Sequence, residues 1–336
     1  MTSKVNERLE NVDLLRGVAI IFVVFFHYTY HYSVEYLLRT DEWSLPIARY
    51  GWSGVDIFFI VSGYCIALTI VKTSNFIEFS IKRFARIYPA YFFCGIVTLV
   101  FYSFFDLPGR EVNWYTGFMN LIFANFIPGL KFQYIDGIYW ALMIELKFYI
   151  FFGIIYFIFK NLNKAIIVWF FFSVILNLLL LFDNEQVTFF TSISPHSNLF
   201  LIGLMVFNLK EKSYISYLLI TLFALINIFI NERYLGFEIF FIFLILITTL
   251  ALKIKVNLRF NFLSKIGLVS FSWYLLHNSI GIIIIRELNK IGVENYSVII
   301  AILITLFFSS ISYKFIEIPL KRMIIGTYSL NLKKFF

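Results

Sequence analysis

The chain has 336 residues, of which 60% are hydrophobic and only 14% are charged, and its mean hydropathy is +0.84. A water-soluble domain needs more charge on its surface, so that class is excluded. Apolar runs of about 17–25 residues recur, the length that an α-helix needs to cross a bilayer core roughly 30 Å thick. A membrane β-barrel would instead show alternating segments of about ten residues. The sequence therefore predicts an all-α polytopic membrane protein.

The net charge of +8 and the two cysteines add further exclusions. No basic run is interleaved with exposed aromatic residues, so nucleic-acid binding is not expected, and the charge is interpreted as a record of topology. Cys65 and Cys94 both fall in apolar runs, which argues against a disulfide framework or a Cys-rich metal site. The first apolar run is long and lacks a small-residue cleavage site, so we expect a retained signal anchor.

About ten crossings are predicted in one membrane domain that fills residues 1–336. With a cytoplasmic N-terminus, the cytoplasmic segments hold 20 of the 28 Lys and Arg residues and the outer segments hold seven. Because Lys and Arg concentrate on the cytoplasmic side, both termini are predicted to be cytoplasmic. The predicted crossings are 14–32, 52–71, 87–105, 137–159, 165–182, 194–209, 214–231, 234–252, 267–286 and 296–316.

Residues 114–130, WYTGFMNLIFANFIPGL, are apolar enough to suggest an eleventh crossing. A crossing here would turn every later basic loop outward, and Asn120, Asn125, Pro128 and Gly129 interrupt the run. We therefore expect a re-entrant or interfacial segment, which membrane proteins tolerate where it packs against protein or lines a cavity.

The first crossing carries four polar groups on one helical stripe: Asp13, Arg16, His27 and His31. Arg16 and His27 are separated by about three turns, roughly 16 Å, with an angular offset of only about 20°. Asp13 and His31 fall within about 60° of them. Ionisable groups inside a span cost roughly 2.5–3.5 kcal/mol each and mark functional sites by default. One face of this helix is therefore expected to line a polar path, with Arg16 at its cytoplasmic mouth.

His27 suits a general base because imidazole can accept a proton near neutral pH. Two alternatives stay open at this point. His27 could be a structural histidine hydrogen-bonded between helices, and the spacing of His27 and His31 could suit a metal. A third metal ligand would have to come from far along the chain, so no metal is expected.

The second crossing begins GWSGVDIFFIVSGY, with Asp56 on the outer side and Ser62 and Gly63 in mid-span. A small mid-span residue permits close helix packing, which is favoured over catalysis for Ser62, and Asp56 could equally be a solvated end residue. IKRFARIYP is predicted to lie in the cytoplasmic loop just before the third crossing. Arg83 and Arg86 are spaced three residues apart, as on one helical face, and suit phosphate binding. From charge alone, positive-inside anchoring is favoured for this pair.

The fourth crossing begins GIYWALMIELKFYIFF. Glu145 lies about 7 Å deeper than Trp140, and is protonated, paired with a cation or exposed to a water-filled cavity. Tyr149 shares its helical face, whereas Lys147 does not. His277, in FSWYLLHNSI, adds a further imidazole within a span.

Six motifs follow one another between about residues 11 and 320: DLLRGVAIIFVVFFH, GVDIFFIVSGY, RFARIYP, YWALMIELKFY, WYLLHNSI and FIEIP. In this order they resemble the membrane-bound acyltransferase-3 family, which includes bacterial O-antigen and other surface-polysaccharide O-acetyltransferases. Ala141 departs from the family pattern, which often has Ser there.

The resemblance implies a bacterial inner-membrane enzyme that takes acetyl from cytoplasmic acetyl-CoA, without a tightly bound cofactor. The acceptor would be a hydroxyl of a lipid-linked surface glycan, such as O-antigen lipopolysaccharide, on the periplasmic side. By the same resemblance, Arg16 and His27 match the essential pair of the first helix, and Arg83 and Arg86 match the motif that holds CoA phosphates. Glu145 matches the acid of the fourth crossing.

Other functions remain possible at this point. Some relatives carry a fused extracellular hydrolase-like domain; none is seen in this chain, so acceptor recognition is expected to rest on the membrane domain. A transporter or flippase could use the same polar stripe, although no inverted repeat is found. An acyltransferase for a small molecule, or one with a succinyl donor, is a further alternative. His27 acts as base or, less favoured, is itself transiently acylated.

Overall fold

The computed structural model describes residues 2–32, 46–110, 112–127, 129–179, 192–208, 222, 238–253 and 261–335. Within these ranges the chain forms helices and turns and no β-strand, as expected for the all-α class. It divides into two compact units. Unit 1 comprises Met1–Arg16, Val55–Ser80 and Leu142–Ser264, and unit 2 comprises Gly17–Gly54, Ile81–Ala141 and Lys265–Phe336.

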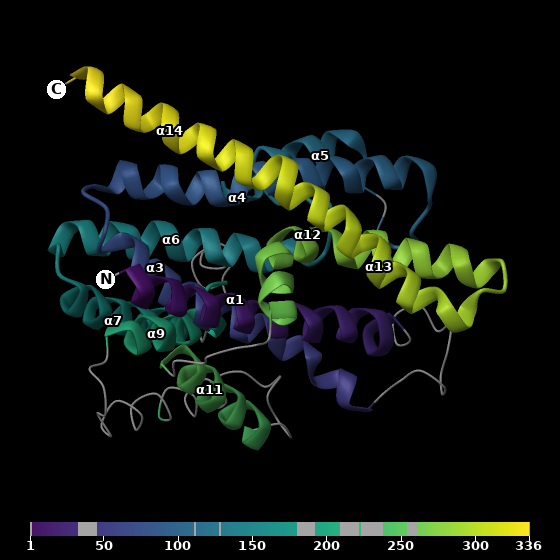
Figure 1. Ribbon diagram of the computed structural model, residues 1–336, viewed down its shortest axis with the longest axis horizontal. Coiled ribbons are helices and arrows are strands. Elements are labelled where there is room, and N and C mark those ends of the chain that lie inside the picture. Colours follow the sequence, from purple (N-terminus) through teal and green to yellow (C-terminus); the bar gives the residue numbers. More distant parts are fainter. Residues whose placement is uncertain are drawn as a thin grey trace. The chain divides into compact units, whose positions relative to one another are not determined.

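Most elements are α-helices, and two π-helical segments, η1 and η5, continue α1 and α13 without a break (Figure 1). The elements are α1 (Thr2–Phe25), η1 (Phe26–His31), the 3-10 helix η2 (Pro46–Ser53), α3 (Gly54–Ile70), α4 (Phe76–Phe104), α5 (Trp114–Leu121), the 3-10 helix η3 (Ala124–Phe126), α6 (Tyr139–Phe159), α7 (Leu162–Leu179), α9 (Ser194–Asn208), α11 (Glu238–Lys253), α12 (Asn261–Lys290), α13 (Glu294–Ser312), η5 (Tyr313–Glu317) and α14 (Ile318–Phe335).

Among the described residues, seven helical segments are long and apolar enough to cross a membrane, and each overlaps a predicted crossing. The segments are Glu10–His31, Ala48–Ile70, Phe76–Phe104, Tyr139–Phe159, Leu162–Leu179, Phe262–Lys290 and Glu294–Ser329. The predicted crossing 194–209 coincides with α9, which has only 15 residues, and 234–252 is largely covered by α11, which has 16. The crossing 214–231 lies outside the described residues apart from position 222. The number of ten crossings therefore stays a prediction.

The α4 helix begins eleven residues before the predicted third crossing, at Phe76 rather than 87. Asn75 Oδ1 accepts the Glu78 N–H at 2.9 Å, and the Glu78 carboxylate accepts the Ser74 N–H at 2.8 Å. These contacts cap the helix start and favour a turn that hydropathy alone does not register. Placing Arg83 and Arg86 in a loop was therefore wrong, because both lie on α4.

The segment 114–130 is interrupted, as its sequence predicts. The short helix α5 is capped by Asn113, whose side chain accepts the Thr116 N–H at 2.8 Å. Phe123 then adopts a left-handed conformation (φ 58°) before η3. Neither helix is long enough to cross a membrane.

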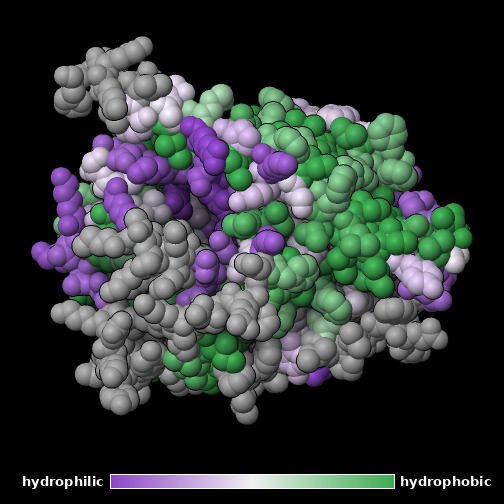
Figure 2. Space-filling view, viewed as in Figure 1, coloured by the Kyte–Doolittle hydropathy of each residue, from purple (hydrophilic) through white to green (hydrophobic). Residues whose placement is uncertain are grey.

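In unit 2, α13 has its apolar side chains exposed and its polar side chains buried, the opposite of an amphipathic helix in a water-soluble protein. Ile299, Leu303 and Phe307 are 52–62% exposed and lie four residues apart on one face, whereas Thr305 and Ser309 are buried. Figure 2 shows hydrophobic residues gathered over the region where α12 and α13 lie in Figure 1. A helix with small polar residues inside and large apolar residues outside is suited to contact with lipid.

Candidate active site

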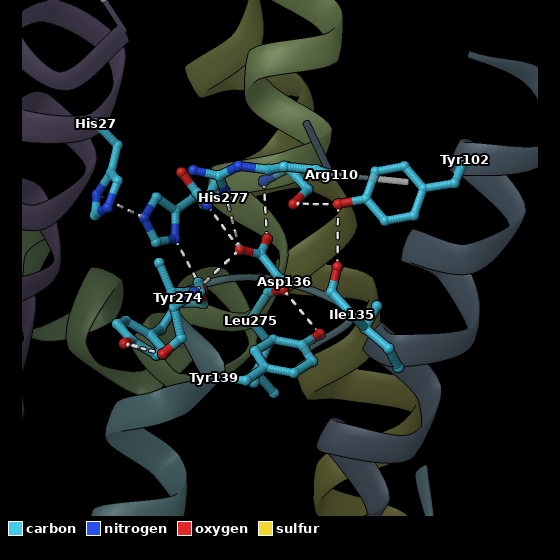
Figure 3. Close-up of polar contacts among 12 residues, drawn as sticks. His27, Tyr102, Arg110, Ile135, Asp136, Tyr139, Tyr274, Leu275 and His277 are labelled. Atoms are coloured by element: carbon cyan, nitrogen blue, oxygen red, sulfur yellow. Dashed lines mark hydrogen bonds and ion pairs between the residues drawn. The ribbon is translucent and has the colours of Figure 1, made fainter. Parts of the chain in front are cut away.

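Two of the predicted histidines meet in unit 2, where η1 approaches the middle of α12 (Figure 3). His27 Nδ1 lies 2.8 Å from the Val23 carbonyl oxygen and 3.3 Å from His277 Nε2. The two rings meet edge to face, with centroids 5.0 Å apart. The His31 ring, also on η1, lies 5.3 Å from that of His27. The structure thus brings His277, which is distant in the sequence, into one cluster with the two imidazoles of η1.

The carbonyl groups around this pair determine which ring nitrogens carry protons. His277 Nδ1 lies 2.8 Å from the Tyr274 carbonyl oxygen. Since a carbonyl only accepts, this nitrogen donates, and in neutral His277 the lone pair is on Nε2. His27 Nδ1 faces that lone pair and the Val23 carbonyl, so it donates as well. The lone pair of neutral His27 is therefore on Nε2, the nitrogen that can accept a proton from a substrate.

A buried carboxylate, Asp136, holds the part of α12 that carries His277. The residue is 1% exposed, and its carboxylate accepts hydrogen bonds from Ser279 N at 2.8 Å, from Asn278 Nδ2 at 2.6 Å and from Ile138 N at 3.2 Å. Arg110 Nη1 lies 3.8 Å from the same carboxylate (Figure 3). Several N–H donors and one guanidinium thus stabilise the charge that burial would otherwise disfavour.

Tyrosine hydroxyl groups fix the same stretch of α12 from several sides. Tyr28 donates to His277 O at 2.6 Å, Tyr139 to Leu275 O at 3.3 Å, Tyr274 to Ile138 O at 2.7 Å and Tyr102 to Ser279 Oγ at 2.7 Å. Gly281 leaves room for this arrangement, because a Cβ there would lie 1.9 Å from the Tyr28 hydroxyl oxygen. The backbone around His277 is therefore held rigidly before any substrate binds.

Two asparagines organise the segment between η3 and α6. Asn120 Nδ2 donates to the Gln133 carbonyl at 2.8 Å, and Asn125 exchanges two hydrogen bonds with the Phe132 backbone, at 2.7 and 3.0 Å. Tyr134 lies in this segment, outside the candidate spans, and burial raises the pKa of its phenol above the ordinary value. The phenol adds no negative charge to the segment near neutral pH.

A second polar cluster lies within unit 1, where two hydroxyl groups converge on one oxygen of Glu145. Ser62 Oγ donates to Glu145 Oε1 at 2.5 Å, Tyr149 donates to the same oxygen, and the two hydroxyl oxygens are 3.2 Å apart. The adjacent Gly63 lets α3 approach α9 closely, since a Cβ there would lie 2.2 Å from the Phe200 carbonyl oxygen. Oε1 of Glu145 is thus engaged by two hydroxyl donors.

The arginines of α4 belong to a third polar region, in unit 2. Arg86 forms an ion pair with Glu317, a carboxylate that is 1% exposed, at the end of η5. Arg83 lies one turn earlier on α4 and is partly buried.

The comparison with known families decides the assignment. A family model described as an acyltransferase domain, of the acyltransferase-3 type, matches residues 9–314. The chain belongs to the acyltransferase-3 family. No solved structure matches it.

Curated relatives of this acyltransferase-3 chain include O-acetyltransferases. The O-acetyltransferase OatA of Staphylococcus aureus is 25% identical over 97% of this chain and 59% of its own length. The peptidoglycan O-acetyltransferase OatA of Listeria monocytogenes is 28% identical over 42% of the chain and 23% of its own length. The O-acetyl transferase of Shigella phage Sf6 is 29% identical over 46% of the chain and 48% of its own length. The chain thus spans less than two thirds of the relatives it matches.

The polar stripe predicted on the first helix of this acyltransferase-3 chain divides between the two units. Asp13 and Arg16 lie on the part of α1 in unit 1 and are partly buried. His27 and His31 lie in unit 2, on η1. Because the helix widens to a π turn from Phe26 onward, the α-helical wheel no longer gives the angular position of His31.

The remaining predicted residues of the acyltransferase-3 chain are placed as follows. Asp56 is fully buried in the first turn of α3, so the alternative of a solvated end residue is wrong. Trp140 is the second residue of α6 and is partly buried. Lys147 donates to Ser192 Oγ at 2.8 Å, while Glu145, two positions earlier, binds the two hydroxyl groups described above.

Three charged residues of the polar clusters described above were missed in the sequence: Asp136, Arg110 and Glu317. Arg110 was counted only as an outer positive charge, and Glu317 was quoted only within FIEIP. A usable signal was present for both acids, since YIDGI and FIEIP each set a single carboxylate among apolar residues. A lone acid in such a setting needs a partner, and it predicts a buried pair.

Proposed function

We propose that this chain is an integral membrane O-acyltransferase that moves acetyl from cytoplasmic acetyl-CoA to a hydroxyl group of a surface glycan on the periplasmic side. Family membership and the three O-acetyltransferase relatives support the reaction class. The observation that carries the proposal is the pairing of His27 with His277, which leaves His27 Nε2 as the basic nitrogen.

In the proposed reaction, the acceptor hydroxyl oxygen attacks the thioester carbonyl carbon of acetyl-CoA. A C–O bond forms, the C–S bond breaks, and the hydroxyl proton passes to His27 Nε2 and then to the departing CoA thiolate. His277 accepts the hydrogen bond from His27 Nδ1, a contact that strengthens as His27 gains positive charge. This is the part that the orienting carboxylate plays in a catalytic triad.

The proposal also gives roles to Arg16, Glu145 and the α4 arginines. Arg16 orients the reacting groups, Glu145 assists from the outer side, and Arg83 and Arg86 bind phosphates of CoA, as the family resemblance implies for the two α4 arginines. A guanidinium suits that last task because its planar N–H donors match phosphate oxygens in pairs.

Replacing His27 with Ala tests the proposal in cells. A general base contributes about 10²–10⁴-fold to a rate, so acetyl incorporation into surface glycan should fall by at least about 100-fold at matched membrane levels of protein. His196→Gln is the matched control, because His196 is a buried histidine of unit 1 that packs against Phe59. Full glycan acetylation by the His27→Ala protein would reject His27 as the base.

A further inference from the structure

The second π-helical segment places a carboxylate inside unit 2. Pro319 has no N–H, and its ring clashes with the carbonyl group four residues earlier, so a regular α-helix is disfavoured in the turn before this position. The chain forms η5 just before it, and η5 ends at Glu317, which is 1% exposed. The other π segment, η1, carries His27. Short π segments occur frequently at functional sites.

Both oxygens of the Glu317 carboxylate are engaged. Oε1 pairs with Arg86, and Oε2 accepts a hydrogen bond from Ser272 Oγ at 3.2 Å. Ser272 Oγ lies 3.1 Å from Ser312 Oγ, which in turn lies 3.6 Å from Cys94 Sγ. A buried charge is costly unless it is paired and hydrogen-bonded, so this network fixes the carboxylate and ties it to the arginine.

Arg86 differs from Glu317 in that part of it reaches the surface. Its side chain is 22% exposed, and its guanidinium carbon lies 5.9 Å from the centre of the Phe271 ring. A guanidinium is planar and rigid, so an ion pair at one edge sets the direction of its other N–H groups. Arg86 is therefore oriented from the buried side by Glu317.

We propose that Glu317 is a positioning residue of the acyl-donor site, which holds the Arg86 guanidinium in the orientation that binds a CoA phosphate. The inference rests on the proposed function, in which Arg86 contacts the donor. It gives Glu317 an effect opposite to that expected from charge alone. A carboxylate that acted only through its negative charge would repel phosphate, and its removal would tighten donor binding. If Glu317 instead positions Arg86, removal of its carboxylate weakens donor binding.

Isothermal titration calorimetry of acetyl-CoA binding to the purified full-length protein shows whether replacing Glu317 weakens or tightens binding. Glu317→Ala should weaken binding by about tenfold or more, and Glu317→Gln by less, because its amide oxygen still accepts a hydrogen bond from Arg86. In kinetic assays the KM for acetyl-CoA should rise more than kcat falls. Glu287→Gln is the matched control, since that glutamate forms an exposed pair with Lys290 and contributes little.

A double-mutant cycle shows whether Glu317 acts through Arg86. In an Arg86→Ala background, Glu317→Gln should change acetyl-CoA binding by less than about twofold, because the group it positions is absent. Glu317→Gln has nearly the native volume, so it decides the question if Glu317→Ala fails to fold.

Unchanged or tighter acetyl-CoA binding by folded Glu317→Gln would overturn the inference and leave the proposed function intact. An additive loss in the double mutant would do the same. If the wild-type protein itself does not bind acetyl-CoA, the proposed function fails, and the role of Glu317 fails with it.

Discussion

At the scale of single residues, the chemistry of His27 depends on where its second nitrogen points. His27 Nδ1 donates to the Val23 carbonyl and to His277 Nε2, so the nitrogen of His27 that remains basic is its own Nε2. The sequence could identify His27 and Glu145 as candidates, because an ionisable group inside an apolar run is unusual on its own. It could not pair His27 with His277, since 250 positions separate them and nothing local relates the two.

Substitution of His277 tests this pairing. His277→Leu removes the acceptor for the His27 Nδ1–H, so the transition state loses a hydrogen bond that strengthens as His27 becomes charged. We expect kcat for acetyl transfer to fall by about 10–100-fold with little change in KM, an effect of about 1.4–2.7 kcal/mol. His277→Gln, whose amide oxygen can accept the same hydrogen bond, should retain more activity in steady-state assays. Equal loss in the two variants would contradict the pairing.

At the scale of elements, the helices were predictable and their irregularities were not. Hydropathy located all seven described spans, because each contains an apolar run long enough to cross a bilayer, although it missed the ends of some of them. It did not predict the early start of α4, which depends on the Asn75 cap. It also did not predict the π segment η5, although Pro319 marks a position where a regular α-helix is disfavoured. Such local deviations position the side chains of the site.

The glycine in the middle of α12 offers a test at this scale. In Gly281→Ala the new Cβ would meet the Tyr28 hydroxyl, which donates to the His277 carbonyl. Overpacking of this kind costs about 1–3 kcal/mol, so we expect a lower unfolding temperature in detergent together with reduced transfer activity. Gly326→Ala on α14 is the control, because no atom lies within 4 Å of its Cβ position. Unfolding temperatures that are equal in the two variants would show that the contact does not matter.

At the scale of the whole molecule, the sequence predicted the all-α membrane class because its composition and the length of its apolar runs together exclude the alternatives. Its charge distribution also predicts the orientation in the membrane. The candidate site could be predicted only in part. The contacts of Asp136 with α12 and with Arg110 form only when the fold brings α12 beside the segment leading into α6. A fold can place such residues together without any regular spacing between them in the sequence.

Reporter fusions check the predicted orientation. With 20 of the 28 Lys and Arg residues in the segments assigned to the cytoplasm, both termini should face that side. A fluorescent protein fused to the C-terminus should therefore fold and fluoresce, and an alkaline phosphatase fused there should be inactive. The opposite pair of results would reverse the orientation and move the α4 arginines to the side without acetyl-CoA.

The most direct test of the central claim is acetyl transfer by the purified protein, supplied with acetyl-CoA labelled in its acetyl group and with extracted lipid-linked glycan. The account predicts that label appears in ester linkage on the glycan with the wild-type protein and is at least about 100-fold slower to appear with His27→Ala. Glycan that is bound or moved across the membrane without acquiring label would contradict it, as would equal labelling by the two proteins.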